Sequence, residues 1–249
     1  MRVVVLGSGS RGNCTYVVAG GTRLLVDAGL RKGEVEARLL AAGEDVPERL
    51  DGIVITHAHG DHHAFAPDLA KRFDCPVYLS EATRRGVPWV ARARTRVISR
   101  TARFDVGEVE LDPLPVPHDA PQVALVLRHE RRVVGLVTDL GHVPLDLAPH
   151  LADCDTLLLE SNHDPEMLER GPYRPALKRR IAGPEGHLAN ADAAALLARL
   201  GAPLRTVVLV HLSETNNRPE LALEPASRAL SGRDTTLLAA TQREPLVVP

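Results

Sequence analysis

The sequence LDGIVITHAHGDHHAF, residues 50–65, passes from an apolar run directly into a cluster of metal-binding side chains. The apolar residues predict a buried strand, and the polar residues after them predict a loop. His57 and His59 are two positions apart at the end of this strand, so in extended backbone both imidazoles project to the same side and can reach one ion. Asp61 and His62 follow a bend that glycine permits, and they can face a second ion.

This cluster favours a metal site over the polarity of an ordinary surface loop. Three histidines and one aspartate fall within six residues, immediately after the apolar run. We expect His62 to open the next helix, whose N-terminus disfavours a protonated imidazole and so keeps the ring neutral, as a ligand must be. The spacing differs from HExxH, in which two histidines share one face of a helix.

Further ligands are expected at the ends of other strands, because one motif seldom completes a site for two ions. His118 follows LDPLPVP, Asp139 ends RRVVGLVTD, and His211 lies near the end of RTVVLVHLS. Taken singly, each is equally well explained as a capping residue or a satisfied polar residue of the core. Beside the HxHxDH motif, we interpret all three as metal ligands.

The remaining sequence predicts mixed α/β layering. Strand-like runs such as CTYVVAG, RLLVDAG, CPVYLS, FDVGEVELDPLPV, QVALVLRHE and CDTLLLES alternate with helical patterns such as KGEVEARLLAAG, FAPDLAKRF and NADAAALLARL. We expect helical structure over residues 163–200, and edge pairing for TTLLAA and PLVV near the C-terminus. No repeat or linker interrupts the pattern, so we predict a single domain over residues 1–249 with no cap domain.

The composition is that of an ordinary soluble globular protein. The 249 residues carry a net charge of −2, so no overall field draws the protein towards nucleic acid or membrane. Aromatic residues make up only 3%, which argues against a surface that binds by stacking bases on many rings. The three cysteines form no CxxC pair, and we find neither a signal peptide nor a membrane span. We therefore expect a cytoplasmic protein with reduced thiols, no membrane contact and no protein partner that the sequence can indicate.

The motif and the three distant ligands resemble the metallo-β-lactamase superfamily. The resemblance implies an αββα sandwich, in which two mixed β-sheets are flanked by helices, and a centre with two metal ions. It assigns His57, His59 and His118 to the first ion, and Asp61, His62 and His211 to the second, with Asp139 bridging. Asp27, in LLVDAG, matches the first motif of the superfamily and would orient a ligand.

A narrower resemblance covers most of the chain. The segments LGSGSRGNCTYV, LESNHDPEMLERGPY, LKRRI, GHLAN and VHLSETNN are similar to the YycJ/WalJ family of metallo-β-lactamase-fold exonucleases. The family usually reads GHLSN, so Ala189 here replaces a serine and removes one hydroxyl near the site, whereas His187 is kept.

The resemblance implies hydrolysis at the metal centre, with Asp61 and His187 as catalytic residues. Two divalent cations that share a carboxylate acidify water and polarise a phosphoryl or carbonyl oxygen. Related phosphodiesterases have a histidine at the position of His187, which makes it the best candidate for the general acid, with helix capping or packing as the alternative. His163 and Asn190 are candidates for substrate contact. Ligation by nitrogen and oxygen suits Zn, Mn or Fe, and the resemblance suggests manganese.

The metal motif does not specify the substrate, since this fold supports many reactions. Residues 82–104 contain seven arginines and no acidic residue, and Arg84 and Arg85 are the first of them. A second basic cluster covers residues 178–180. If these segments border the cleft, they could hold the phosphates of duplex DNA, although solvated helical faces would produce the same pattern.

Four functions fit these features to different degrees. The first is a nuclease, in particular a 5′-to-3′ exonuclease acting on DNA. The second is a small-molecule hydrolase for a cyclic phosphodiester or a thioester, which stays open because the chain has no long insertion between Asp139 and His211 that could clamp nucleic acid. The third is a binding protein without metal, which the apparently complete ligand set opposes. The fourth is a redox di-iron protein, whose HxExDH pattern His59 contradicts.

Overall fold

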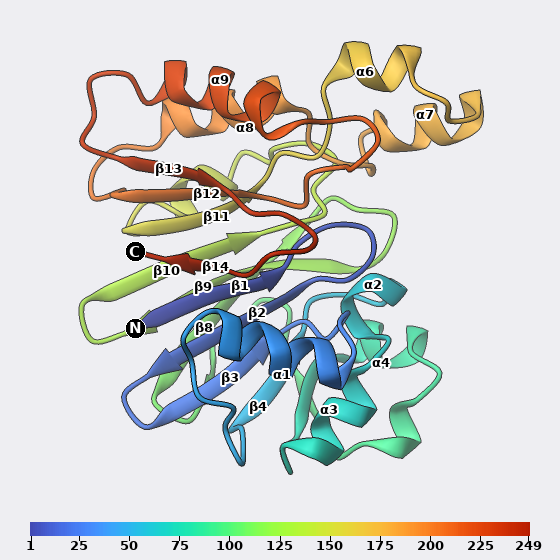
Figure 1. Cartoon of the computed structure of the whole chain (residues 1–249), viewed down its shortest axis with the longest axis vertical. Coiled ribbons are helices and arrows are strands. Elements are labelled where there is room, and N and C mark those ends of the chain that lie inside the picture. Colours follow the sequence, from blue (N-terminus) through green and yellow to red (C-terminus); the bar gives the residue numbers. More distant parts are fainter.

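Two β-sheets of seven strands each pack face to face in the computed structural model, which describes residues 1–249, and helices cover both outer faces (Figure 1). The first sheet has the order β14-β1-β2-β3-β4-β5-β6. Its strands are β1 (Arg2–Gly7), β2 (Cys14–Ala19), β3 (Thr22–Val26), β4 (Gly52–Ile55), β5 (Val77–Ser80), β6 (Thr95–Ile98) and β14 (Leu246–Val248). The second sheet has the order β13-β12-β11-β10-β9-β8-β7. Its strands are β7 (Phe104–Val106), β8 (Val109–Val116), β9 (Gln122–His129), β10 (Arg132–Val137), β11 (Thr156–Glu160), β12 (Thr206–Val210) and β13 (Thr236–Ala239).

Nine α-helices and one short 3₁₀ helix connect the strands. They are α1 (Lys32–Ala41), α2 (Gly60–His63), α3 (Ala66–Arg72), α4 (Glu81–Gly86), the 3₁₀ helix η1 (Val90–Arg92), α5 (Leu147–His150), α6 (Pro165–Arg170), α7 (Pro175–Ile181), α8 (Asn190–Arg199) and α9 (Pro219–Ala229). None of these helices is both long and apolar enough to cross a membrane.

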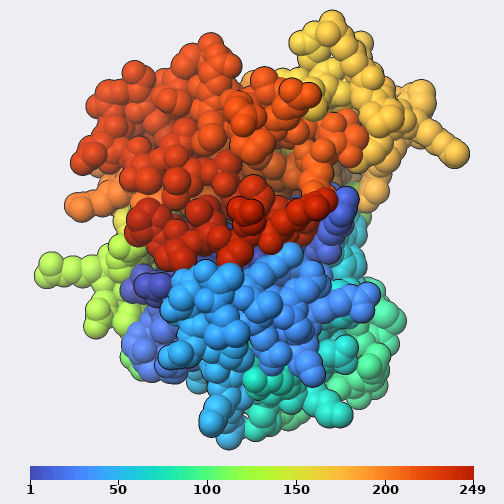
Figure 2. All heavy atoms as spheres, viewed as in Figure 1, coloured from blue at the N-terminus to red at the C-terminus, as the bar shows by residue number.

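Three apolar layers hold the sandwich together, which confirms the predicted αββα arrangement. Side chains such as Val54 and Leu125 form the layer between the two sheets. Leu39 of α1 and Phe73, directly after α3, belong to the layer on the outer face of the first sheet, and Leu197 of α8 belongs to the layer on the outer face of the second. In the space-filling view, α8 and α9 lie in the orange and red upper part of the surface, and α1 lies in the blue lower part (Figure 2).

Both sheets are mixed, and their parallel strands determine where the site lies. In the first sheet β3, β4, β5 and β6 run parallel, and in the second sheet β10, β11, β12 and β13 do so. The carboxyl ends of these strands point to the side on which α2, α6 and α7 lie (Figure 1). Loops that leave parallel strands at one edge bring distant residues together, which is where ligands bind in open α/β sheets.

Several elements differ from the sequence-based expectation. The run over residues 104–116 is a hairpin of β7 and β8 rather than one strand, because Gly107 turns the chain with a φ of 59°. The two C-terminal strands lie at the edges of different sheets, β13 beside β12 and β14 beside β1. Helix α9 was not expected, since Pro225 lies inside it and breaks the apparent pattern. All three cysteines are free and buried.

Candidate metal centre

Five parallel strands end at the site, and each brings at least one polar side chain to it. Their carboxyl ends carry Asp27 after β3, His57 after β4, Asp139 after β10, Glu160 on β11 and His211 after β12. Asp27, Asp139 and His211 have positive φ angles of 62°, 55° and 56°. This left-handed conformation is uncommon for residues other than glycine, and such residues gather at functional sites.

Three imidazoles form the first group of candidate ligands, and they are the residues that the resemblance assigns to one ion. The ring nitrogens of His57, His59 and His118 lie within 4.8 Å of one another, with His118 Nε2 only 3.2 Å from His59 Nδ1. The opposite nitrogens are held by the protein: His59 Nε2 lies 3.1 Å from a carboxylate oxygen of Asp119. His118 Nδ1 lies 3.0 Å from the carbonyl oxygen of Gly186. These contacts fix which nitrogen faces the centre.

Asp61, His62 and His211 form the second group, again within 4.8 Å of one another. The Oδ2 atom of Asp61 lies 3.5 Å from His62 Nε2 and 3.5 Å from His211 Nε2. His62 is fully buried, and its Nδ1 lies 2.7 Å from Oδ2 of Asp27. Asp27 therefore orients the ring of His62. Burial opposes a charge on His62, but the carboxylates of Asp139 and Asp27 on either side raise its pKa well above the usual value.

Asp139 lies between the two groups. Its Oδ2 is 3.0 Å from His62 Nε2, and its Oδ1 is 3.8 Å from His118 Nε2. Burial alone would raise the pKa of this carboxyl, yet the imidazoles around it, His211 and His62 first among them, hold the pKa well below its ordinary value. Asp139 is therefore an ionised carboxylate placed to contact both groups.

The donor atoms fit divalent cations. His57 Nε2 and His211 Nε2 are buried and have no hydrogen-bond partner, and an unpaired buried polar atom costs about 1–3 kcal/mol. Burial, together with the neighbouring His62, lowers the pKa of His57, which keeps a lone pair on its ring. All candidate ligands offer nitrogen or oxygen, which Zn, Mn and Fe accept. A cation bound by these lone pairs would remove the cost of leaving them unpaired.

Glu160, which was not predicted from the sequence, joins two site histidines. Its side chain is fully buried, and its Oε1 lies 2.9 Å from His187 Nδ1 and 2.9 Å from His211 Nδ1. Its Oε2 accepts hydrogen bonds from the backbone N–H groups of Leu140 and Leu188. Burial opposes ionisation, but His187 and His211 lower the pKa of Glu160 to about 2. The available signal was a charged residue that ends the apolar strand TLLLE, the same signal that indicated Asp139.

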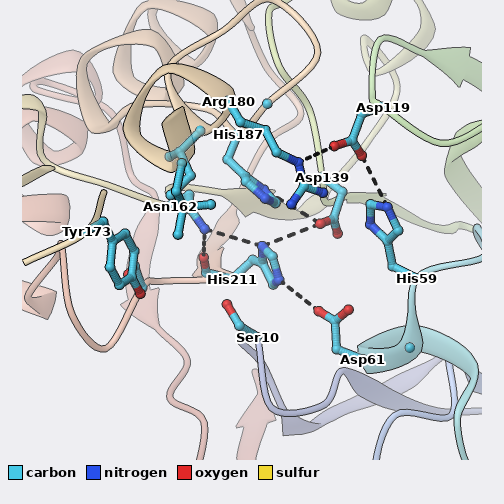
Figure 3. A pocket seen from close by; sticks show the side chains of 15 residues that line it. Ser10, His59, Asp61, Asp119, Asp139, Asn162, Tyr173, Arg180, His187 and His211 are labelled. Carbon is cyan, nitrogen blue, oxygen red and sulfur yellow. Dashed lines mark hydrogen bonds and ion pairs between the residues drawn. The ribbon is translucent and has the colours of Figure 1, made fainter. Parts of the chain in front are cut away.

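His187 lines the pocket above the candidate ligands (Figure 3). Because Glu160 holds its Nδ1, the nitrogen left for the pocket is Nε2. Burial lowers the pKa of His187, but the Glu160 carboxylate outweighs burial and raises the pKa above the usual value. The ring can therefore carry a proton near neutral pH.

The pocket itself has a volume of about 360 Å³. Figure 3 shows the labelled side chains of Asp61, Asp139 and His211 converging in it, with Asp119 and Arg180 at one side and Tyr173 at another. Its remaining lining residues are Ser10, His59, Gly60, Asn162, Leu177, Ile181, Gly186, His187 and Ser213. This volume admits a single chain segment or a small ester rather than a duplex.

Two predicted substrate contacts lie outside this pocket. Asn190 is buried, and its amide group bonds to Ser161 and Asn217, so it fixes the start of α8 to the end of β11. His163 is also buried, and its backbone bridges to Ala189. Burial lowers the pKa of His163. The structure brings neither side chain to the pocket.

The arginines of residues 82–104 also lie outside the pocket lining, and each has a partner elsewhere. Arg84 and Arg85 both pair with Glu81 on α4. The other five contact acidic, aromatic or backbone groups: Arg92 with Asp68, Arg94 with Asp74, Arg96 with Tyr78, Arg100 with the carbonyl of Gln122, and Arg103 with Asp112 and Glu110. Glu81, which lies directly before this segment, and acidic residues of other segments pair with most of these arginines, so the sequence pattern overstated the free positive charge.

Comparisons with known proteins find similarity over most of the chain. Residues 22–212 match the Beta-lactamase superfamily domain. Exodeoxyribonuclease WalJ of Streptococcus pneumoniae is 36% identical over 232 residues, covering 88% of this chain and 84% of that protein. Exodeoxyribonuclease YycJ of Bacillus anthracis is 34% identical over 232 residues, covering 91% and 88%. The metallo-beta-lactamase fold protein YhfI of Bacillus subtilis shares the fold with a TM-score of 0.75 at 18% identity, covering 99% of this chain and 98% of that one.

Proposed function

Because this chain belongs to the metallo-β-lactamase superfamily and, within it, to the family of the WalJ and YycJ exodeoxyribonucleases, we propose that it releases nucleotides stepwise from the 5′ end of DNA. It is a metal-dependent hydrolase. The observation that carries the proposal is the convergence of two groups of candidate ligands around Asp139, with Glu160 and His187 beside them.

The proposed centre holds two divalent ions. His57, His59 and His118 would hold the first ion, Asp61, His62 and His211 the second, and Asp139 would contact both. Such cations, when bound, acidify water and polarise a phosphoryl oxygen. Manganese is the proposed metal, and zinc and iron are chemically possible because all the donors are nitrogen or oxygen.

The chain's own groups would move the proton. His187 in its charged form donates the Nε2 proton to the 3′ oxygen that leaves when the phosphodiester bond breaks. Glu160 keeps the proton on Nδ1 in place and stabilises the positive charge of the ring before the transfer. The same carboxylate orients His211, so the proton donor and one ligand are held by a single buried group.

The test uses the full chain, stripped with a chelator and reloaded with Mn²⁺. Linear duplex DNA labelled at either the 5′ or the 3′ end is compared with bis(p-nitrophenyl) phosphate. We expect the 5′ label to be released first, as a mononucleotide, and covalently closed circular DNA to resist. Asp61→Ala should abolish activity on DNA and on the ester, whereas Asp68→Ala, which removes an exposed carboxylate from α3, should leave both intact.

Two results would contradict the proposal. Hydrolysis of the small ester alone would identify a small-molecule phosphodiesterase, which the modest pocket volume would also suit. Release of the 3′ label first would reverse the proposed direction.

A further inference from the structure

We propose that residues 164–186, which carry α6 and α7, bind the DNA strand as it enters the pocket. Tyr173 and Leu177 would lie against the base and sugar beside the cleaved bond. The phosphates of the strand would contact Arg174, Lys178 and Arg179. This inference rests on the proposed function, because it names the element that binds the proposed substrate. The segment leaves the body between β11 and α8 and forms the yellow projection in Figures 1 and 2.

One wall of the pocket belongs to this segment. All three apolar side chains of the lining come from it, namely Tyr173, Leu177 and Ile181. Leu177 and Ile181 are four residues apart on α7, so they share one face of the helix. Leu177 is 37% exposed, which makes it one of only five large apolar side chains of the chain that remain exposed. An apolar wall beside a polar metal centre fits a ligand with a charged phosphate and an apolar base.

The polar groups of the wall suit a phosphate. Arg180 lines the pocket and donates its Nε–H to Asp119 at 2.5 Å, and its two terminal nitrogens have no hydrogen-bond partner in the protein. Asp119 also contacts His59, and these two contacts of Asp119 hold the guanidinium of Arg180 beside the candidate metal centre. A planar guanidinium with free N–H groups is well suited to phosphate oxygens.

The outer surface of the segment carries uncommitted positive charge. Residues 170–183 contain five basic residues and no acidic residue, and α7 buries none of its side chains. Arg174 and Arg179 form no ion pair or side-chain hydrogen bond, and Lys178 contacts only the carbonyl oxygen of Glu169. This contrasts with the arginines of residues 82–104, all of which are engaged. Free cations next to a cleft are the feature that binds phosphates regardless of sequence.

The decisive experiment measures DNA binding separately from catalysis. The metal-free full chain is titrated against a fluorescent single-stranded oligonucleotide over a series of salt concentrations. The double variant Arg174→Ala/Arg179→Ala is compared with Arg131→Ala/Arg228→Ala, which also removes two exposed charges. Arg131 lies in the turn that precedes β10, at the opposite end of that strand from Asp139, and Arg228 lies in the last turn of α9. Unfolding temperatures verify that each variant folds.

We expect the Arg174/Arg179 variant to bind more weakly and to lose about 1.4 from the slope of log Kd against log salt, as two lost phosphate contacts require. The Arg131/Arg228 variant should keep the slope. Tyr173→Ala should raise Kd about tenfold or more, and Tyr173→Phe, which keeps the ring, should stay close to the unchanged chain. Because Tyr173 has no hydrogen-bond partner for its hydroxyl group, the phenylalanine isolates the effect of the ring.

Equal slopes of log Kd against log salt for the two double variants, or equal increases in Kd for both Tyr173 variants, would overturn the inference. If the unchanged Mn²⁺-loaded chain still digests DNA in that case, the proposed function stands without this segment. If the unchanged chain hydrolyses only the small ester but the Arg174/Arg179 slope falls, the segment binds nucleic acid and the proposed exonuclease activity fails instead.

Discussion

Each of three histidines at this site has one ring nitrogen towards the centre and the other ring nitrogen in contact with a carboxylate. The carboxylate of Asp27 holds His62, Asp119 holds His59, and Glu160 holds His211. Such a partner holds the proton of one ring nitrogen, so the other nitrogen offers its lone pair to the centre once it has lost its own proton, as a metal ligand requires. Removing one of these partners should therefore affect metal binding and catalysis together.

Glu160 gives the sharpest test at the residue scale. We expect Glu160→Gln to lower kcat/KM or metal affinity by about 10–100-fold, because partners behind the ligands have effects of this size. The amide is as large as the carboxylate but cannot accept both imidazole N–H groups as an anion does. Metal content by elemental analysis and steady-state rates on DNA measure the effect. Glu224→Gln, on the exposed face of α9, is the control, and equal rates for the two variants would contradict the role of Glu160.

His187 can be separated from the ligands by metal content. We expect His187→Ala to lower kcat by about 10²–10⁴-fold, as the loss of a general acid does, while the protein keeps its bound metal. The reason is that His187 Nδ1 is occupied by Glu160 and its other nitrogen faces the pocket. Loss of metal from this variant would make His187 a ligand and refute the assignment as general acid.

At the scale of elements, hydrogen bonds connect the loop of the HxHxDH motif to the segment that follows β5. Trp89, just before η1, donates its indole N–H to His63 Nδ1 at 2.9 Å. His63 Nε2 lies 3.2 Å from the carbonyl oxygen of Ala58, within the HxHxDH loop. Trp89 and His63 are both buried. The chain's only tryptophan thus ties residues 81–92 to the loop that carries four candidate ligands.

Replacing this tryptophan should destabilise the folded chain. We expect Trp89→Phe to lower the free energy of unfolding by about 1–3 kcal/mol, because it leaves the buried His63 Nδ1 without a donor. Urea unfolding followed by circular dichroism measures the change, since the variant has no tryptophan fluorescence. An unchanged unfolding midpoint would show that the contact contributes nothing to stability.

At the scale of the whole molecule, the candidate centre joins the two sheets. His57, His59, Asp61 and His62 follow β4 of the first sheet, whereas His118, Asp139 and His211 follow strands of the second. Ions held by both sets would connect the halves of the sandwich across their common edge. Metal binding should therefore stabilise the entire fold and not only the site.

Thermal unfolding tests this link. A cation at about 100 times its Kd adds about 2.7 kcal/mol of stability, which for a chain of this length is a rise in Tm of about 5–10 °C. We expect a chelator to lower Tm by this amount and Mn²⁺ or Zn²⁺ to restore it. In Asp139→Ala the metal-induced rise should shrink strongly. A Tm that does not respond to metal in the unchanged chain would exclude a centre that links the sheets.

The metal motif, the three distant ligand candidates and the layered α/β architecture could be predicted from local patterns, in which apolar runs form strands and ligand-type residues stand directly after them. The superfamily was predicted from its resemblance to these motifs. Residues within a few positions of one another, such as His57 and His59, reveal their relation without knowledge of the fold.

Which distant groups meet could be seen only in the folded chain. Glu160 is 27 residues from His187 and 51 from His211, and only the parallel pairing of β11 with β12 sets it beside His211. The arginines of residues 82–104 looked free, but Arg84 and Arg85 pair with Glu81 directly before the segment, and the other five contact groups in other segments of the chain. Arg174 and Arg179 proved to be the uncommitted ones. Charge in a sequence is local, but its neutralisation depends on contacts that form only when the chain folds.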